Sequence, residues 1–323
     1  MADPALLDIV ICRIPGLKGK ERIELQKAFD KEGKFSLPSK KDIENILGRN
    51  LGDRSWTMSQ IRSMAEKDVS TALRLDIKLV SWRDSSYPPL LREIFDPPVL
   101  LFYRGVLPNP EKPLVAVVGT RTLSSKAAVS AYNLGRELGE AGIPVVSGLA
   151  LGVDSMAHRG NIDGCSPTVA VLGSGPDHVY PISNRGLARR ILDNGGIILS
   201  EYPPETKPFK ANFPARNRII SAMARGTVIV EAPEKSGALI TARFALEQGR
   251  DLWVHSVGLD SERGAGTRCL AEEGALVISS AAEILSDWGM AELKNRRRNK
   301  WEDEKGSNAC MISSMAEYLN IKL

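Results

Sequence analysis

Side chains that bind anions gather in a few short segments of this 323-residue chain. One of them, FPARNR (213–218), places two arginines around an asparagine. Another, SGLALGVDSMAH (147–158), combines glycines and serines with an aspartate and a histidine. Arginine supplies forked donors, and small residues let backbone N–H groups approach a phosphate, above all at the start of a helix. These segments predict a site for phosphate or another polyanion.

The polar residues of FPARNR divide between two roles. Its proline predicts the first turn of a helix, where free N–H groups point toward a ligand. Side chains two positions apart on a helix point about 200° away from each other, so Arg216 and Arg218 do not face one phosphate. We expect Arg216 and Asn217 to face the ligand. Arg218 is expected to brace the fold against Glu201 or Glu231.

Arg121 is the strongest single candidate for ligand contact. It lies two residues beyond the apolar run 115–119, where an unpaired buried arginine would be unfavourable, so a ligand role is favoured. Gly148 and Gly152 fit two interpretations equally, because glycine permits both a tight strand-to-helix turn and direct backbone contact with an anion.

Other chemistries fit these residues less well. Ser147, Asp154 and His158 suggest a hydrolytic triad, but no G-x-S-x-G elbow surrounds the serine. Asp154 and His158 are four residues apart, so we expect Asp154 to brace one helix with His158 as its hydrogen-bond partner. His178 and His255 show no ligand spacing, and no metal is expected. Neither G-x-G-x-x-G nor G-x-x-x-x-G-K-[ST] occurs, which disfavours a dinucleotide or P-loop cofactor.

Six short apolar runs must position these segments, because each segment follows one of the runs. Near-continuous hydrophobicity is typical of parallel strands buried on both faces, and amphipathic stretches of helical period separate the runs. Gly142, Gly195 and Gly249 follow such stretches as expected left-handed caps. The pattern predicts an α/β fold with a doubly wound, mostly parallel sheet that binds ligands beyond the carboxyl ends of its strands. The runs are VAVVG (115–119), IPVVSGL (143–149), TVAVLG (168–173), GIILSEY (196–202), TVIVEA (227–232) and DLWVHSV (251–257).

Composition along the chain predicts three parts: a helical N-terminal domain at 1–76, a Rossmann-like domain at 77–288, and a basic linker and tail at 289–323. The Pro-Gly-Leu-x-Gly turn near the front fits a SAM-like or helix-hairpin-helix element as well as an ordinary turn before a helix. The formal charge of +4 permits a nucleic-acid partner without requiring one. Four cysteines without ligand spacing, and no signal-like or bilayer-length apolar run, predict a cytoplasmic protein without a membrane partner.

The chain resembles the DNA processing protein DprA (Smf) family from about 84 to 285. The resemblance implies an extended Rossmann-like domain that binds and protects single-stranded DNA without a cofactor and without enzymatic activity. It also implies a homodimer that helps load the RecA recombinase during natural transformation. Six colinear motifs carry the resemblance: YPPLLREIFDPPVLLFYRG, VAVVGTR, VVSGLALGVDSMAH, VAVLGSGPDHVYPISN, SEYPPETKPFKANFPARNRII and VIVEAPEKSGALITARFALEQGRD.

The resemblance extends the set of site residues. Phe213 becomes a candidate for stacking on a base, although packing in the core at the helix start is an equal alternative. The expected DNA contacts are Gly119, Thr120, Arg121, Ser147, Gly148, Gly173, Asn184, Arg185, Lys210, Asn212, Phe213, Arg216 and Asn217. The residues expected to support the site are Asp154, His158, Arg218, Glu231, Ser236 and Gly237.

The sequence departs from the family pattern at several places. Lys126 and Ala127 replace a frequent Tyr-Gly, HSVG replaces the usual V-P-G at 255–258, and Arg268 replaces a common Asn or His. The tail from 290 shows no clear winged-helix pattern. The alternative function is a nucleotide phosphoribohydrolase of the lysine-decarboxylase-like (LOG) group, whose P-G-G-x-G-T-x-x-E motif is only partly matched by APEKSGALITARFA.

Overall fold

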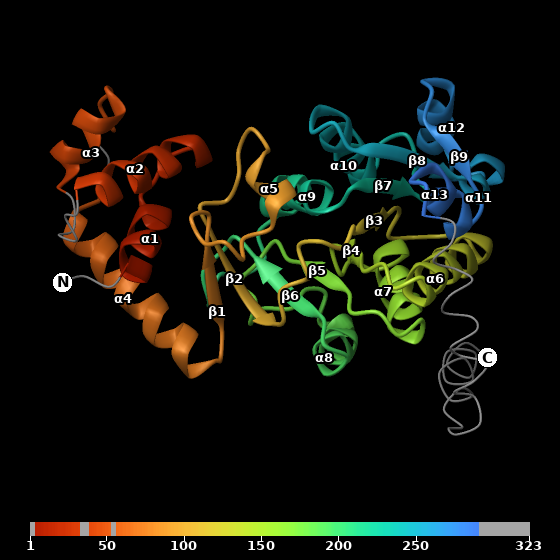
Figure 1. The fold of residues 1–323 in the computed structure, drawn as a ribbon, viewed down its shortest axis with the longest axis horizontal. Helices are drawn as coiled ribbons and strands as arrows, with labels where there is room; N and C mark the ends of the chain where they lie inside the picture. Colours follow the sequence, from red (N-terminus) through yellow and green to blue (C-terminus); the bar gives the residue numbers. More distant parts are fainter. Residues whose placement is uncertain (1–3, 33–38, 53–55, 291–323) are drawn as a thin grey trace.

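The computed structural model describes residues 4–32, 39–52 and 56–290, which form a helical region followed by a large sheet with helices packed on it (Figure 1). Ser39 and Thr57 begin two helices with capping boxes, in which the side-chain oxygen accepts an N–H group of the first turn. The predicted basic tail beyond 290 lies outside the described residues. The N-terminal helices are α1 (Pro4–Arg13), α2 (Gly19–Glu32), α3 (Lys40–Leu47) and α4 (Met58–Arg74).

Within the described residues, nine strands form one sheet in the order β1-β2-β6-β5-β4-β3-β7-β8-β9. β2 pairs with β1 and β6 in antiparallel fashion, and all other neighbours are parallel. β4 to β6 extend from β3 to one side and β7 to β9 to the other, which confirms the predicted doubly wound class. The strands are β1 (Lys78–Ser81), β2 (Leu100–Gly105), β3 (Val115–Val118), β4 (Val145–Ser147), β5 (Val169–Val171), β6 (Ile197–Ser200), β7 (Gly226–Ile229), β8 (Asp251–His255) and β9 (Leu276–Ile278).

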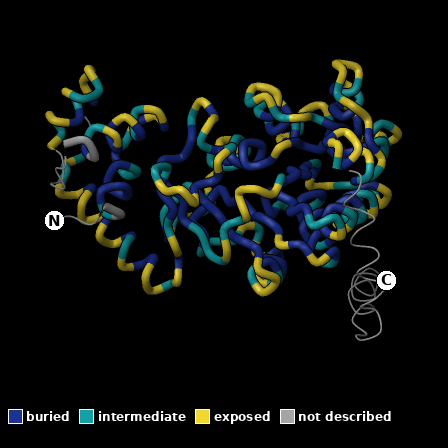
Figure 2. The backbone as a smooth tube through the Cα atoms, viewed as in Figure 1, coloured by how far each residue is buried: buried dark blue, intermediate teal, exposed yellow. Residues whose placement is uncertain are grey.

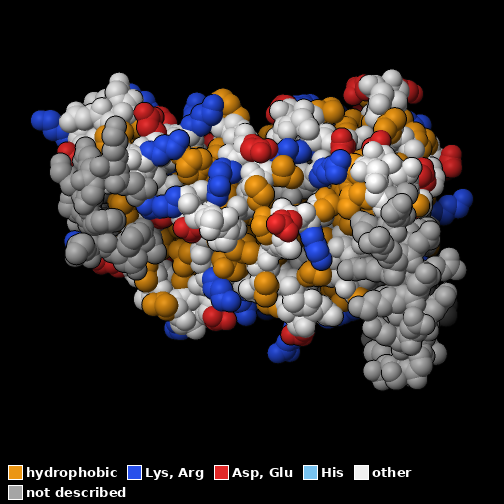
Figure 3. Space-filling view, viewed as in Figure 1, with side chains coloured by type: hydrophobic (Ala, Val, Ile, Leu, Met, Phe, Trp, Pro, Cys, Tyr) orange, Lys and Arg blue, Asp and Glu red, His pale blue; other side chains and the backbone are white. Residues whose placement is uncertain are grey.

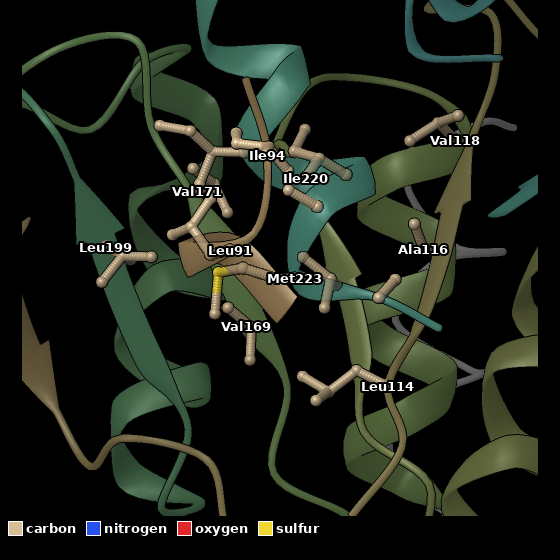
Figure 4. Close-up of a cluster of buried hydrophobic side chains, with 14 of the residues drawn as sticks. Leu91, Ile94, Leu114, Ala116, Val118, Val169, Val171, Leu199, Ile220 and Met223 are labelled. Carbon is tan, nitrogen blue, oxygen red and sulfur yellow. The ribbon is translucent and has the colours of Figure 1, made fainter. Parts of the chain in front are cut away.

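The central strands are buried on both faces, as their continuous apolar runs predict. Every residue of β3 to β7 is buried (Figure 2). Alternate residues of β3 enter two different cores: Ala116 and Val118 pack on one face, and Val115 and Val117 on the other. Figure 4 shows the first core, in which Leu91 and neighbouring side chains meet the sheet. Burial on both faces makes this sheet a rigid base for the loops that follow it.

Helices cover both faces of the sheet. α6, α7 and α13 contribute to the core around Val115 and Val117, whereas α5, α9 and α10 contribute to the core around Ala116 and Val118. Gly142, Gly195 and Gly249 have positive φ after α6, α8 and α10, as expected for caps. These elements are α5 (Pro89–Arg92), α6 (Ser125–Glu140), α7 (Val153–Asp163), the 3-10 turn η1 (Ile182–Asn184), α8 (Arg185–Asp193), α9 (Asn212–Met223), α10 (Gly237–Glu247), α11 (Ser256–Asp260), α12 (Ala265–Glu272) and α13 (Ala281–Asp287).

α6 and α7 approach each other closely through glycines on both helices. A Cβ atom at Gly135 would lie 2.4 Å from the carbonyl oxygen of Ala157, and one at Gly160 would lie 2.0 Å from the carbonyl oxygen of Tyr132. Any larger side chain at these positions would push the two backbones apart. The contact therefore fixes α7, and with it the loop that joins β4 to α7.

Three strands are not predicted by the apolar runs. β1 precedes the proline-containing segment 84–105 and β2 ends it, and two of the three residues of β9 are exposed. β1 and β9 are the two edge strands of the sheet, and an edge strand needs little continuous hydrophobicity because one of its sides lacks a neighbouring strand. β2 pairs on both sides, with β1 and β6.

The N-terminal helices share a core with the sheet. Ile9, Leu25 and Ile61 from three of these helices belong to the same buried cluster as Leu100 and Phe102 of β2. None of the described helices is both long and apolar enough to cross a membrane.

Candidate functional site

The loops after β3, β4 and β5 and the first turns of α9 surround a small hollow of about 60 Å³, which we call the central hollow. It lies beyond the carboxyl ends of the parallel strands, where open α/β sheets bind ligands. Its lining residues are Arg121, Gly148, Ala150, Leu151, Tyr180, Pro181, Phe213 and Arg216. Four of these eight were expected from the sequence as DNA contacts.

Two aromatic rings and one guanidinium lie together at the central hollow. The ring centres of Tyr180 and Phe213 are 5.6 Å apart with a 45° tilt. The Arg121 guanidinium carbon lies 5.7 Å from the centre of the Phe213 ring, within the range of a cation–π contact. Arg121 is exposed, Tyr180 is 45% exposed and Phe213 is half-buried. Phe213 therefore both packs at the start of α9 and contributes to the hollow.

Arg216 lies under the central hollow and is 4% exposed. Its Nη1 donates to the carbonyl oxygens of Gly148, at 2.9 Å, and Val171, and its Nε donates to Asn217 Oδ1 at 3.3 Å. Burial lowers the pKa of Arg216 to about 10, so the guanidinium stays charged at neutral pH. Arg216 therefore holds two strand ends together while bordering the hollow, and its expected contact with DNA stays a prediction.

Asp154 and His158 do not form the expected pair. Asp154 accepts the N–H groups of Gly148, at 3.0 Å, and Ala150, at 3.3 Å, whereas His158 Nδ1 lies 2.7 Å from Thr168 Oγ1. The free N–H groups of the loop lie N-terminal to Asp154 and attract its carboxylate. The brace on the start of α7 is therefore present, but with different partners.

Electrostatics around these two buried side chains follow from desolvation. Burial raises the pKa of Asp154, and the nearby positive charge of Arg216 opposes that rise. Burial, with a smaller contribution from the same charge, lowers the pKa of His158 to about 3. His158 is therefore neutral at physiological pH.

Several expected contact residues instead hold the loops in place. The Ser147 hydroxyl donates to the carbonyl oxygen of Val117 at 2.7 Å and is fully buried. Asn184 is 4% exposed, and its Nδ2 donates to the carbonyl oxygen of Leu149 and to Ser155 Oγ, both at 2.9 Å. Neither side chain is open to a ligand, which corrects the expectation of direct contact. A one-letter motif does not show which side of a loop a polar group faces.

The loop after β3 and the start of α9 also make internal contacts. The Thr120 N–H donates to the carbonyl oxygen of Glu231 at 2.7 Å, and a Cβ atom at Gly119 would lie 2.5 Å from Val153 Cγ2. Asn212 Nδ2 donates to the carbonyl oxygen of Gly173 at 3.1 Å. Gly119, Thr120, Gly173 and Asn212 therefore fix the loops of the site, and their expected contact with DNA stays a prediction.

Glu231, Ser236 and Gly237, which were expected to support the site, make hydrogen bonds within the protein. Glu231 is fully buried and accepts the Ser124 N–H at 2.9 Å and the Ser261 hydroxyl. Ser236 accepts the N–H of Ala238 and so caps α10. Asn217, expected to face the ligand, donates to the carbonyl oxygen of Gly237 at 3.2 Å, so it connects α9 to the start of α10.

Arg218 points away from Arg216 and forms the expected ion pair with Glu201. Its Nη1 and Nη2 each lie 2.7 Å from a carboxylate oxygen of Glu201, and its Nε donates to the carbonyl oxygen of Asp96 at 3.1 Å. The i, i+2 geometry thus separates the two arginines as predicted. Glu231, the alternative acidic partner, pairs elsewhere.

Two cations expected to contact DNA lie outside the central hollow, and one aromatic residue that lines it was not among the expected contacts. Arg185 and Lys210 are exposed but do not line the central hollow. Tyr180, which was not among the expected contacts, lines it beside Phe213. The Tyr-Pro pair after β5 was the signal for it, because this loop lies at the carboxyl end of a central strand. Among the described residues, no group of three or more His, Cys, Asp or Glu side chains is placed to hold a metal.

The fold and this hollow place the chain in a known class of DNA-handling proteins. The model of the DNA recombination-mediator protein A family matches residues 78–289, and the chain belongs to that family. DNA processing protein DprA of Streptococcus pneumoniae is 40% identical over 205 residues, which cover 64% of this chain and 72% of the relative. Protein Smf of Borreliella burgdorferi is 31% identical over 303 residues, which cover 94% and 93%.

Two solved structures are similar to this one. The structure of DNA processing protein A from Streptococcus pneumoniae has a TM-score of 0.76 at 32% identity and covers 88% of this chain and 98% of its own. DNA processing protein A from Helicobacter pylori, described with a single-stranded DNA binding mode, has a TM-score of 0.56 at 28% identity and covers 70% and 96%. The DprA (Smf) resemblance carried by the sequence motifs is thereby confirmed.

Proposed function

We propose that this chain binds single-stranded DNA at the central hollow. The observation that carries the proposal is the group of Arg121, Tyr180 and Phe213 at the carboxyl ends of the central strands. Single strands are held by cations along the backbone and by stacking of bases on aromatic rings, and this group supplies both. The relative from Helicobacter pylori, which binds single-stranded DNA, supports the assignment.

The rigid setting of these side chains favours binding. Arg216 and Asp154 fix the loop after β4 from below, so an incoming strand meets a surface that is already ordered. Little ordering entropy then opposes binding. If three or four phosphates are neutralised, log K for binding falls with log salt at a slope of about −2 to −3.

Family membership supports three finer proposals. The chain acts in the cytoplasm as a homodimer, protects incoming single strands and helps load RecA onto them. RecA loading is tested by the delay before RecA hydrolyses ATP on single strands coated with single-strand-binding protein. Addition of the chain should shorten this delay, and an unchanged delay would refute the loading role.

Binding to DNA is tested with Arg121→Ala. Loss of an exposed cation beside Phe213 should weaken single-strand binding at least about tenfold and leave the unfolding temperature unchanged, because charge-assisted contacts contribute about 1.5–3 kcal/mol each. Arg62→Ala is the matched control, since Arg62 is an exposed arginine on α4. Fluorescence anisotropy of a labelled oligonucleotide measures the affinity of both variants. Wild-type affinity in Arg121→Ala would refute single-strand binding at the central hollow.

The phosphoribohydrolase alternative is not favoured by the geometry. The buried carboxylate nearest in sequence to the Ser236–Gly237 turn is Glu231, and both of its oxygens accept hydrogen bonds from the protein. Release of a free base from a nucleoside monophosphate, with no binding of single strands, would reverse this preference.

A further inference from the structure

A second hollow, of about 340 Å³, lies between α2 and the segment 82–97, and we call it the lateral hollow. Its floor is apolar, because Ile23, Ile94 and Pro97 are buried there. Its rim is basic. Figure 3 shows Lys and Arg side chains gathered with apolar ones on the face between α2 and α5. The lining residues are Lys20, Ile23, Glu24, Lys27, Trp82, Arg92, Ile94 and Pro97.

Cations lie against the ring of Trp82, which lines this hollow, and against the ring of Phe95, which lies next to the lining residue Ile94 without lining the hollow itself. Lys20 Nζ lies 3.7 Å from the centre of the Phe95 ring, and Lys27 Nζ lies 4.9 Å from the centre of the Trp82 ring. Arg92 lies 5.9 Å from the same Trp82 ring. Phe95 is 76% exposed, although a phenyl ring in a fold is normally covered. Among the lining residues, three cations face a single acid, so the hollow suits an anion that carries flat rings.

The two hollows flank the start of α9. Arg216 borders the central hollow from one side of this helix. On the other side Arg218 contacts Asp96, with Nε 3.3 Å from Oδ2, and Asp96 follows the exposed Phe95 directly. A helix with its side chains is about 10–12 Å wide, so a strand that occupies both hollows has to cross at least that distance at α9.

We propose that the lateral hollow is a second binding site for the same single-stranded nucleic acid that occupies the central hollow. Phe95 stacks on a base, and Lys20 and Lys27 bind the neighbouring phosphates. This inference rests on the proposed function and assigns part of the N-terminal helical region to it. An acidic peptide would also pair with the positive charges, but planar bases can in addition stack on the exposed ring next to the cations.

The test compares oligonucleotides of two lengths, roughly 5 nucleotides, near the lower end of known single-strand site sizes, and roughly 20 nucleotides, beyond their upper end. Full-length wild type is compared with Phe95→Ala, with Lys20→Gln/Lys27→Gln, and with the control Lys41→Gln, an exposed lysine on α3. Phe95→Ala should weaken binding of the long strand at least about fivefold and leave the short strand unchanged. The double variant should reduce the salt slope for the long strand by about 1.4.

The outcomes separate this inference from the proposed function. If wild type binds neither oligonucleotide, the proposed function and this inference both fall. If Arg121→Ala loses binding but the lateral variants bind the long strand like wild type, the proposed function stands and the inference is wrong. A glutamate- and tyrosine-rich peptide serves as the competing probe. If wild type binds that peptide, and Phe95→Ala loses the peptide but keeps its affinity for the strand, the inference is also overturned.

Discussion

Arg218→Met removes the cation from an ion pair that ties α9 to the end of β6. The pair is largely buried, because the side chains of Arg218 and Glu201 are only 13% and 14% exposed. Burial by itself would lower the pKa of Arg218, but the charges of Glu201 and Asp96 raise it above its ordinary value. The variant leaves Glu201 buried without its partner while keeping the aliphatic part of the side chain.

The size of the effect follows from this burial. Removing one partner of a buried pair costs about 3–5 kcal/mol. The lower end applies here, because Asp96 is 42% exposed and its carboxylate can turn to water. A loss of about 3 kcal/mol corresponds to a fall of about 4 °C in the unfolding temperature, given an unfolding entropy of about 2.1 cal/mol/K per residue.

Thermal and urea unfolding measure this loss. Glu201→Gln and the double variant complete a thermodynamic cycle, in which the second substitution should cost much less after the first. Arg62→Met is the control, because Arg62 and Glu66 form an exposed pair worth only about 0.3–0.5 kcal/mol. If Arg218→Met destabilises no more than the control, or if the folded variant loses strand affinity like Arg121→Ala, the pair does not have the structural role assigned to it.

Three further predictions follow from the buried groups of the site. Arg216→Met should lower both the free energy of unfolding and the affinity for single strands, and an affinity loss alone would refute its buried role. The pKa of His158 is lowered to about 3 in the folded protein, so the stability that its buried neutral ring contributes is present above pH 6.5 and is lost as pH falls toward 3. In urea unfolding, the contribution of His158 to the free energy of unfolding should fall by about 2 kcal/mol from pH 7 to pH 5. NMR should show the His158 ring unprotonated at pH 5. Gly152→Ala should cost about 2 kcal/mol or more in chemical unfolding, because φ is +82° and the new Cβ would lie 2.2 Å from the carbonyl oxygen of Thr120. Gly186→Ala, in α8 and with nothing within 4 Å of its Cβ, is the control and should leave stability unchanged or raise it by up to about 1 kcal/mol.

The regular elements around the site were largely readable from the sequence. Buried parallel strands must be apolar on both faces, so each run from 115 to 257 marked a strand. The positive φ of Gly142 and Gly195 was readable for a similar reason, since few residues other than glycine adopt that backbone after a helix. The opposite directions of Arg216 and Arg218 follow from helix geometry alone.

The partners of polar side chains were not readable in the same way. Asp154 and His158 have the spacing of a helical pair, yet loop N–H groups attract one and Thr168 the other. Ser147 belongs to a segment that looks suited to a ligand, but its hydroxyl points into the sheet. The hydrogen-bond partner of each of these side chains depends on which unsatisfied polar group lies nearest after the chain has folded.

The sequence by itself determined the doubly wound sheet, the edge at which we propose that a ligand binds and the family to which the chain belongs. These features depend on local hydrophobic periodicity, on turn residues and on colinear motifs. Only the tertiary structure decided that Arg216 lies under the hollow, that Tyr180 joins Phe213 and that Phe95 stands exposed above a basic rim. Burial and direction are properties of the packed chain, because they depend on residues that are far apart in sequence.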